Sequence, residues 1–381
     1  MTAYPMFKVH VETERALDGL RTVFNSGFVN EGLQVTEFKD ALCDYLKVSQ
    51  LVLMNSCTST LTVALKLCGV GPGTDVVTTP MTCIATNTPI VNLGGRIVWA
   101  DIDPNTASID PADVERKITP ATKAIMCVAW AGTPCDLDAL DALARRKGIP
   151  LIHDAAHAFG ATWRDRPLSE FADFTCYSFQ AIKHLSSGDG GALICRDPDQ
   201  FVLARKLKWF GYDRDAHKDA RGEWKGQRWD ADILEGEVGY KFNMNNVSAA
   251  IGLSQMPHID RILGQHRKNA AVYEDAFRNS RSIRSLTIPP QAKSSYWVYT
   301  VLTHDGVDRN RLLEKLNAEG IAAGLVHQPN DLYTAFKPYN AELPGLRRFA
   351  DRQISLPCGW WLSEADCRHI ADRVQALADA G

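Results

Sequence analysis

An aspartate and a lysine stand where two predicted buried strands end. Asp154 lies in the apolar run 150–155, and Lys183 follows the run 174–179 in the stretch "SFQAIKHLSSGDGG". Ligands of open α/β sheets bind at the carboxyl ends of strands, so both side chains are candidates for one site. A partly desolvated lysine has a lowered pKa and can form a Schiff base with an aldehyde. Taken alone, Asp154 is equally a helix N-cap, and Lys183 is a solvated loop cation.

A third candidate lies earlier, at a predicted strand-to-helix junction. The stretch "NSCTSTLTVAL" places small and hydroxyl-bearing residues at Ser56 to Thr60. Free backbone N–H groups and the helix dipole suit a phosphate there, and simple N-capping explains the same residues. The sequence shows no G-x-x-x-x-G-K-[ST] motif and no G-x-G-x-x-G at such a junction, which argues against a nucleotide-hydrolysing P-loop or a standard dinucleotide site.

The three signals together describe a site for pyridoxal 5′-phosphate (PLP). Asp154 pairs with the protonated pyridine nitrogen, Lys183 reacts with the aldehyde, and the helix N-terminus binds the phosphate. Each signal is weak alone. Their order in the chain, with Asp154 and Lys183 on nearby strand ends, makes the combination more specific.

The elements that position these residues follow from the hydrophobic pattern. Most of the predicted strands are continuously apolar rather than alternating, which is typical of strands covered on both faces. Helical stretches such as "DLDALDALARRKG" separate them. We therefore predict a large, doubly wound, mostly parallel seven-stranded sheet with strands in the runs 51–56, 75–80, 96–102, 124–130, 150–155, 174–179 and 191–196.

The pattern changes after the last of these strands. Residues 208–245 are rich in charge, aromatic rings and glycine, and they form an excursion too long for a plain connector. A helix interrupted at Pro257 follows, and then segments typical of a small α+β unit. We predict a large domain at 1–255, and a linking helix with a small C-terminal domain at 256–381.

Composition excludes several classes of function. The 381 residues are 45% hydrophobic and 23% charged with a formal net charge of -3, which gives no electrostatic case for nucleic acid or an anionic membrane. No apolar run is long enough to span a bilayer, and no signal peptide is visible. The ten cysteines are scattered without a C-x-x-C, which favours reduced thiols in the cytoplasm over a metal site or disulfides.

Across nearly its whole length the sequence resembles the DegT/StrS-type sugar aminotransferases, which are PLP enzymes of fold type I. The specific pair of motifs is "HDAAHAFGA" with "SFQAIKHLSSGDGG". Supporting segments match in order: "SGFVNEGLQVTEFKDALCDYLKV", "NSCTSTLTVALKLCGVGPGTDVVTTPMTCIATN", "ADIDPNTASID", "GYKFNMNNVSAAIGLSQM" and "ISLPCGWWLSEAD".

The resemblance implies a role for each matching residue. Lys183 would carry the internal aldimine and then move protons to and from the substrate. Asp154 would keep the pyridine nitrogen protonated, and His157 would lie beside the cofactor ring or its hydroxyl. The phosphate would be bound at the helix N-terminus and at the start of the lysine motif, by Cys57, Thr58 and Ser178.

Three positions depart from the family pattern. Cys57 replaces the usual glycine of the phosphate loop, and Cys83 stands where an aromatic residue usually stacks on the ring. Lys241 replaces the commoner asparagine in the segment that would reach the phosphate in the other subunit, where lysine acts as a point charge. That arrangement implies a homodimer with shared active sites.

The implied reaction is transamination. The enzyme would transfer an amino group, with L-glutamate as donor and 2-oxoglutarate as product, to a nucleotide-linked keto-deoxy sugar by ping-pong kinetics, passing through the pyridoxamine form (PMP). Such enzymes supply deoxyamino sugars for O-antigen, polysaccharide or antibiotic biosynthesis. The alternatives are a PLP-dependent sugar dehydratase or lyase, which the presence of Lys183 disfavours, and a non-enzymatic PLP-binding regulator, which the lack of a basic helix-turn-helix disfavours.

Residues that contact the substrate are harder to assign. Trp209, Tyr212 and Arg214 in the excursion are candidates to stack on a base or pair with a diphosphate, and packing beneath a long loop explains them equally well. His327 in "GIAAGLVHQP" matches a family region near the sugar nucleotide, and an ordinary loop histidine is the alternative.

Overall fold

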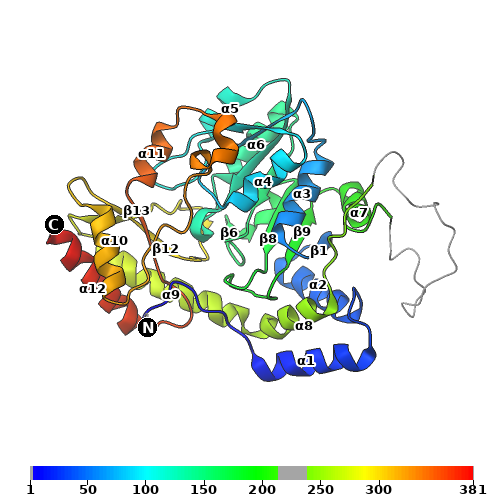
Figure 1. Cartoon of the computed structure of the whole chain (residues 1–381), viewed down its shortest axis with the longest axis horizontal. Helices are drawn as coiled ribbons and strands as arrows, with labels where there is room; N and C mark the ends of the chain where they lie inside the picture. Colours follow the sequence, from blue (N-terminus) through cyan, green and yellow to red (C-terminus); the bar gives the residue numbers. More distant parts are fainter. Residues whose placement is uncertain (1–2, 213–237, 381) are drawn as a thin grey trace.

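A seven-stranded sheet forms the centre of the molecule. The computed structural model describes residues 3–212 and 238–380, so Arg214 and the middle of the predicted excursion lie outside the described residues (Figure 1). Each predicted run contains or overlaps one strand of the sheet: β1 Leu51–Met54, β2 Asp75–Thr78, β3 Arg96–Trp99, β4 Thr122–Val128, β5 Leu151–Asp154, β8 Phe174–Ser178 and β9 Gly191–Cys195.

The sheet is mostly parallel, as predicted. Its strand order is β1-β9-β8-β5-β4-β2-β3. The pairs from β8 across to β3 are parallel, whereas β9 runs antiparallel to both of its neighbours. All residues of β1, β2, β5, β8 and β9 are buried. This burial explains their continuous hydrophobicity, because both faces of the sheet are covered.

Two hydrophobic clusters lie on the two faces of the sheet, which makes the fold doubly wound. One joins Leu51 and Ile125 to Phe38 and Leu140, and the other joins Val52 and Met126 to helices on the opposite side. Helices surround the sheet in Figure 1. The first face is covered by α2 (Leu33–Leu46), α5 (Pro111–Lys117), α6 (Leu137–Lys147) and α8 (Asn246–Gln255), and the second by α3 (Cys57–Leu67), α4 (Ile84–Asn92) and α7 (Pro198–Leu207). Helix α1 (Thr13–Ser26) packs on α8.

The helix interruption predicted at Pro257 is present. Helix α8 ends at Gln255, a 3-10 turn spans Met256–His258, and α9 continues over Ile259–Phe277. The prediction of a domain boundary at residue 255 stays a prediction, and α9 leads from the large sheet toward the C-terminal elements (Figure 1).

A smaller antiparallel sheet follows in the C-terminal part, with the order β10-β12-β13. Helices α9, α10 and α12 share a hydrophobic cluster with it. These elements are β10 Ile283–Ser285, β12 Tyr299–Thr303, β13 Gln353–Leu356, α10 Arg309–Ala318, α11 Pro344–Ala350 and α12 Glu364–Asp379. A third small sheet, β11-β6-β7 (Ala292–Lys293, Thr162–Trp163 and Arg166–Pro167), joins the two parts of the chain. The N-terminal residue Tyr4 pairs with Ile321 beside α10.

Glycines shape the loop that carries Lys183. Gly188 has φ +79, which a residue with a side chain rarely adopts, so it makes the turn that returns the chain to β9. Gly191 serves a different purpose. A Cβ placed on it would lie 2.6 Å from the backbone of Ser56 and Cys57, so only glycine lets β9 pass this close to the start of α3.

We expect Gly191→Ala to lower the free energy of unfolding by about 1–3 kcal/mol, because the added methyl group overpacks against backbone that cannot move aside. Gly264→Ala in α9 is the matched control, since a Cβ there meets no atom within 4 Å. Alanine favours the helix, so this control should gain about 0.4–1 kcal/mol. Urea unfolding followed by fluorescence measures both, and equal values for the two variants would contradict the prediction.

Candidate active site

A cavity of about 300 Å³ lies at the carboxyl ends of β1, β4, β5 and β8. Loops that leave these strands meet here, as expected for an open α/β sheet. Residues far apart in the sequence therefore line one space. Of the site residues predicted from the sequence, the cavity is lined by Cys57, Thr58, Cys83, Asp154, His157, Ser178, Lys183 and His327.

Asp154 is a buried carboxylate held by two donors. It ends β5 and is 3% exposed. The Thr86 hydroxyl donates to one oxygen at 2.7 Å, and the Ala156 N–H donates to the other at 3.0 Å. Burial raises the pKa of Asp154, and the two hydrogen bonds and the charge of Lys183 oppose that rise. A carboxylate in this position gains stability from a cation placed in the cavity.

Thr86 is a site residue that the sequence did not reveal. It lies in α4, accepts a 2.7 Å hydrogen bond from the Thr82 hydroxyl, and lines the same cavity as Asp154. The only signal in the sequence is the pair of threonines in "TCIATN", a stretch that is also an ordinary helix start.

Lys183 lies in the loop after β8 with its amine inside the protein. Its N–H donates to the Gln180 carbonyl at 2.9 Å, and Ser187 closes the loop onto Phe179. The Nζ atom lies 3.7 Å from the ring centroid of Trp297. Burial lowers the pKa of Lys183 to about 8, against the opposing charges of Cys83 and Asp154. The interpretation of Lys183 as a solvated surface cation is therefore wrong.

The N-terminus of α3 has both a side-chain cap and free backbone N–H groups. Ser56 caps the helix, because its hydroxyl accepts from the Ser59 N–H at 3.1 Å. The N–H groups of Cys57 and Thr58 have no acceptor within the helix, as is usual in a first turn, so they are available to an anion. Burial raises the pKa of the Cys57 thiol well above its usual range. The side chain that replaces the family's glycine is therefore neutral and does not repel a phosphate.

Aromatic rings form another wall of the cavity. His157 stacks on Trp297 with ring centroids 3.9 Å apart, and it also stacks on His327 at 5.3 Å. The edge of Trp130 packs against both histidines. Burial lowers the pKa of His157 well below its usual range and that of His327 to about 3, so both imidazoles are neutral near pH 7. Trp297 lies shortly before β12. It was not predicted as a site residue, because the stretch "SSYWVYT" has the composition of a strand.

Two predicted residues of the excursion, Trp209 and Tyr212, do not line this cavity. Trp209 is 9% exposed and contacts Lys241, whose Nζ lies 4.3 Å from the indole centroid. The two residues form a bridge where the two ends of the excursion meet. Tyr212 is half-buried next to them, and Arg214 lies outside the described residues. The burial of Trp209 agrees with packing beneath the loop, the alternative that the sequence left open.

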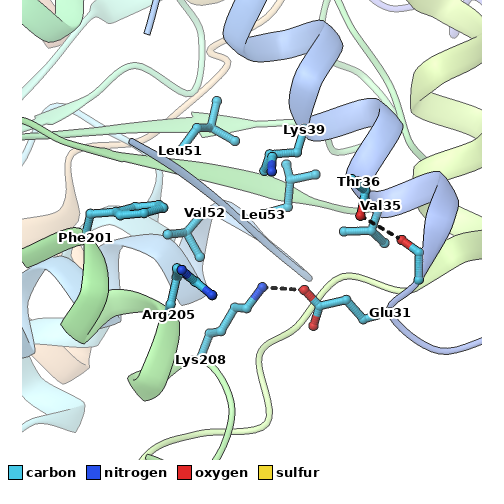
Figure 2. A pocket seen from close by; sticks show the side chains of 11 residues that line it. Glu31, Val35, Thr36, Lys39, Leu51, Val52, Leu53, Phe201, Arg205 and Lys208 are labelled. Carbon is cyan, nitrogen blue, oxygen red and sulfur yellow. Dashed lines mark hydrogen bonds and ion pairs between the residues drawn. The ribbon is translucent and has the colours of Figure 1, made fainter. Parts of the chain in front are cut away.

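A second cavity, of about 220 Å³, lies between α2, α7 and the edge strand β1 (Figure 2). Its main polar feature is the buried ion pair between the Lys208 ammonium and the Glu31 carboxylate. Lys208 is thus already paired, and Leu51 and Phe201 line much of the rest. The pair ties the segment before α2 to the base of the excursion, which is a structural role.

Among the helices that the structure describes, none has the length and apolar character needed to cross a bilayer. Within residues 3–212 and 238–380, no group of three or more His, Cys, Asp or Glu side chains is arranged to hold a metal ion.

Comparison with known proteins decides the family. A profile of the DegT/DnrJ/EryC1/StrS aminotransferase family matches residues 10–375. The chain belongs to this aminotransferase family. Among its relatives is the spore coat polysaccharide biosynthesis protein SpsC of Bacillus subtilis (strain 168), which is 31% identical over 93% of this chain and 91% of the relative.

Solved structures agree with this assignment. The sugar aminotransferase CalS13 from Micromonospora echinospora is 33% identical with a TM-score of 0.89, covering 99% of this chain and 100% of that one. Spr1654 from Streptococcus pneumoniae, in its PMP form, is 27% identical with a TM-score of 0.90, covering 99% of each chain. The fold is therefore PLP fold type I, as predicted.

The cofactor of this aminotransferase is PLP, and the cavity fits it. Asp154 is a buried carboxylate that needs a cation, Lys183 is a buried amine of lowered pKa, and the start of α3 offers backbone donors for a phosphate. All three line the same cavity, which supplies a partner for each of the three reactive parts of the cofactor.

We expect the cofactor-free protein to combine with PLP at a rate that rises with pH through a midpoint of about 8, because burial lowers the pKa of Lys183 to that value. Below the midpoint the amine is protonated and cannot attack an aldehyde; above it the neutral amine predominates. Growth of the absorbance band of the bound cofactor measures the rate, with Lys183→Ala as the blank. A midpoint near the ordinary lysine value of about 10.4 would mean that the amine is solvated.

Proposed function

We propose that this aminotransferase moves an amino group from L-glutamate to the keto carbon of a nucleotide-linked keto-deoxy sugar. The observation that carries the proposal is the meeting of Asp154, Lys183 and the α3 N-terminus on one cavity. The relatives support a sugar as substrate, because CalS13 is a sugar aminotransferase and SpsC takes part in polysaccharide biosynthesis. The product would be an amino sugar.

Asp154, Cys57, Thr58 and Ser178 are proposed to hold the cofactor. Asp154 stabilises the protonated pyridine nitrogen, and the other three bind the phosphate with N–H and hydroxyl donors. When bound, PLP withdraws electrons from the substrate carbon and so weakens its C–H bond. Thr86 orients Asp154 by donating to one of its oxygens, which leaves the carboxylate little freedom to turn away.

Lys183 is proposed to move the proton. Its Nζ has a pKa lowered to about 8 by burial, so the amine both accepts and releases a proton near neutral pH. His157 and His327 are neutral and present ring nitrogens, 3.4 Å apart, to the cavity. We assign His157 to the cofactor ring or its hydroxyl, and His327 to a polar group of the substrate. Cys83, which also lines the cavity, packs on the cofactor ring in place of an aromatic side chain.

Ping-pong kinetics are part of the proposal, because both half-reactions need the same Lys183 and the same cofactor. The keto acid made from the donor must then leave before the sugar enters. Donor and acceptor use the same Lys183 in turn.

A homodimer is proposed to complete the site. Large apolar side chains are exposed on α1, on the loop that follows it and at the start of α2, which is typical of a surface covered by a partner. These are Phe24, Phe28, Val29 and Leu33, at 60%, 44%, 46% and 62% exposure. In such a dimer Lys241 would reach the cofactor phosphate of the partner subunit. All ten cysteines are free, which supports a reducing compartment, and we propose the cytoplasm.

We expect the PLP form, mixed with L-glutamate, to convert to the PMP form and release one 2-oxoglutarate per site, because the donor half-reaction needs no sugar. Absorbance and an enzymatic assay of 2-oxoglutarate measure it. Nucleotide-linked 4-keto and 3-keto sugars should then restore the PLP band. Lys183→Ala should be slower by at least about 100-fold, since the acid–base group is gone. Removal of a sugar hydroxyl without 2-oxoglutarate release would instead indicate a dehydratase.

We expect Lys183→Ala and Lys241→Ala to complement each other when mixed. Each variant alone lacks one residue at every site. A mixed dimer has one site with both residues intact if Lys241 acts across the interface, so co-refolded equal amounts should recover about a quarter of wild-type activity. No recovery, with mixed dimers present by mass spectrometry, would mean that Lys241 acts within its own chain.

A further inference from the structure

The Trp297 indole is placed against the Lys183 amine, with Nζ 3.7 Å from a ring centroid. Cation–π attraction is strongest for tryptophan and for cations removed from water, and Lys183 is half-buried with its amine inside the protein. No ion pair of Lys183 occurs in the part of the chain that the structure describes, and the charge of Asp154 acts on it only at longer range. The indole is therefore the neighbour best placed to stabilise the ammonium form.

Trp297 is itself fixed on several sides. Its Nε1 donates to the carbonyl of Ile182, the residue before Lys183, at 2.8 Å. Its backbone N–H donates to Ala131 at 2.8 Å. The ring stacks on His157, and Phe7 from the N-terminal segment stacks on it with centroids 4.9 Å apart. With 2% exposure, the ring has no space to swing away from the lysine.

We propose that Trp297 is a positioning residue for Lys183, whose amine it holds in the charged form and beside His157 whenever that amine is not bonded to the cofactor. The inference rests on the proposed function, in which Lys183 is released during the first half-reaction and bonds the cofactor again at the end of the second. A buried ammonium needs a partner. A carboxylate in contact would hold the proton too tightly to return it, because it raises the amine pKa strongly. An aromatic face attracts the ammonium less strongly and accepts no proton.

The charge balance around Lys183 involves groups from several elements. They are Asp154 at the end of β5, the thiols of Cys57 and Cys83 at the starts of α3 and α4, and the buried neutral histidines His157, His184 and His327. Asp189 lines the cavity as well. Replacing Trp297 removes none of these groups, and Trp297→Phe keeps an aromatic ring beside His157 while it loses the hydrogen bond to the Ile182 carbonyl.

The test titrates Lys183 directly. The full-length chain is loaded with PMP, which leaves the Lys183 amine free. Its rate of acetylation by acetic anhydride is then measured against pH by mass spectrometry of the peptide that contains it. Trp297→Leu should lower the midpoint by about one unit, a tenfold change in the ratio of amine to ammonium. Trp297→Phe, with a weaker ring, should lower it by about half as much.

Trp360→Leu is the matched control. Trp360 packs in the same region, where its Nε1 donates to the Lys8 carbonyl and its ring contacts His10. In this variant the midpoint of Lys183 acetylation should equal that of the wild type. An unchanged or raised midpoint in Trp297→Leu with PMP still bound would overturn the inference. If Trp297→Leu does not fold, a midpoint in Trp297→Phe equal to that of the wild type would also overturn the inference. Failure of the wild type to bind PMP would contradict the proposed function, and not the assignment of Trp297.

Discussion

Burial of Asp154 and Lys183 in one cavity is the constraint on which the rest of this structure depends. A carboxylate and an amine removed from water are unfavourable unless each has partners, and here they do not form an ion pair with each other. Asp154 is held by Thr86 and the Ala156 N–H, and Lys183 lies against Trp297. The protein therefore keeps two reactive groups apart, each partly satisfied, on the cavity proposed to bind PLP.

The sheet makes this arrangement possible because its strand ends are fixed by buried backbone pairing. Asp154 pairs in register with Val128 and Cys176, so its side chain cannot shift without breaking the ladder. Gly191 lets the antiparallel strand β9 pass within reach of the α3 N-terminus, which holds the lysine loop close to the proposed phosphate site. Rigid strands carry the carboxylate, and a glycine-closed loop carries the amine. The C-terminal part of the chain contributes Trp297 and His327, which close the cavity from the other side.

Much of this was accessible from the sequence. Most of the seven strands are continuously apolar because both faces of the sheet are covered, and that pattern is local enough to recognise in the sequence. The motifs "HDAAHAFGA" and "SFQAIKHLSSGDGG" together led to the cofactor and the family, and the comparisons confirm both. Trp209 and Tyr212 show the limit. Their composition suggested substrate contacts, whereas Trp209 is largely buried at the base of the excursion, away from the cavity of its own chain.

The sequence by itself predicted which side chains do the chemistry: an aspartate, a lysine and a capped helix start, which lie at or after the ends of β5, β8 and β1. Only the tertiary structure decided how those side chains are tuned. The depth of burial that lowers the pKa of Lys183 to about 8, the hydroxyl of Thr86 on Asp154 and the indole of Trp297 on the lysine all come from residues distant in the chain. Desolvation and ring contacts arise from packing in three dimensions, and no local pattern records them.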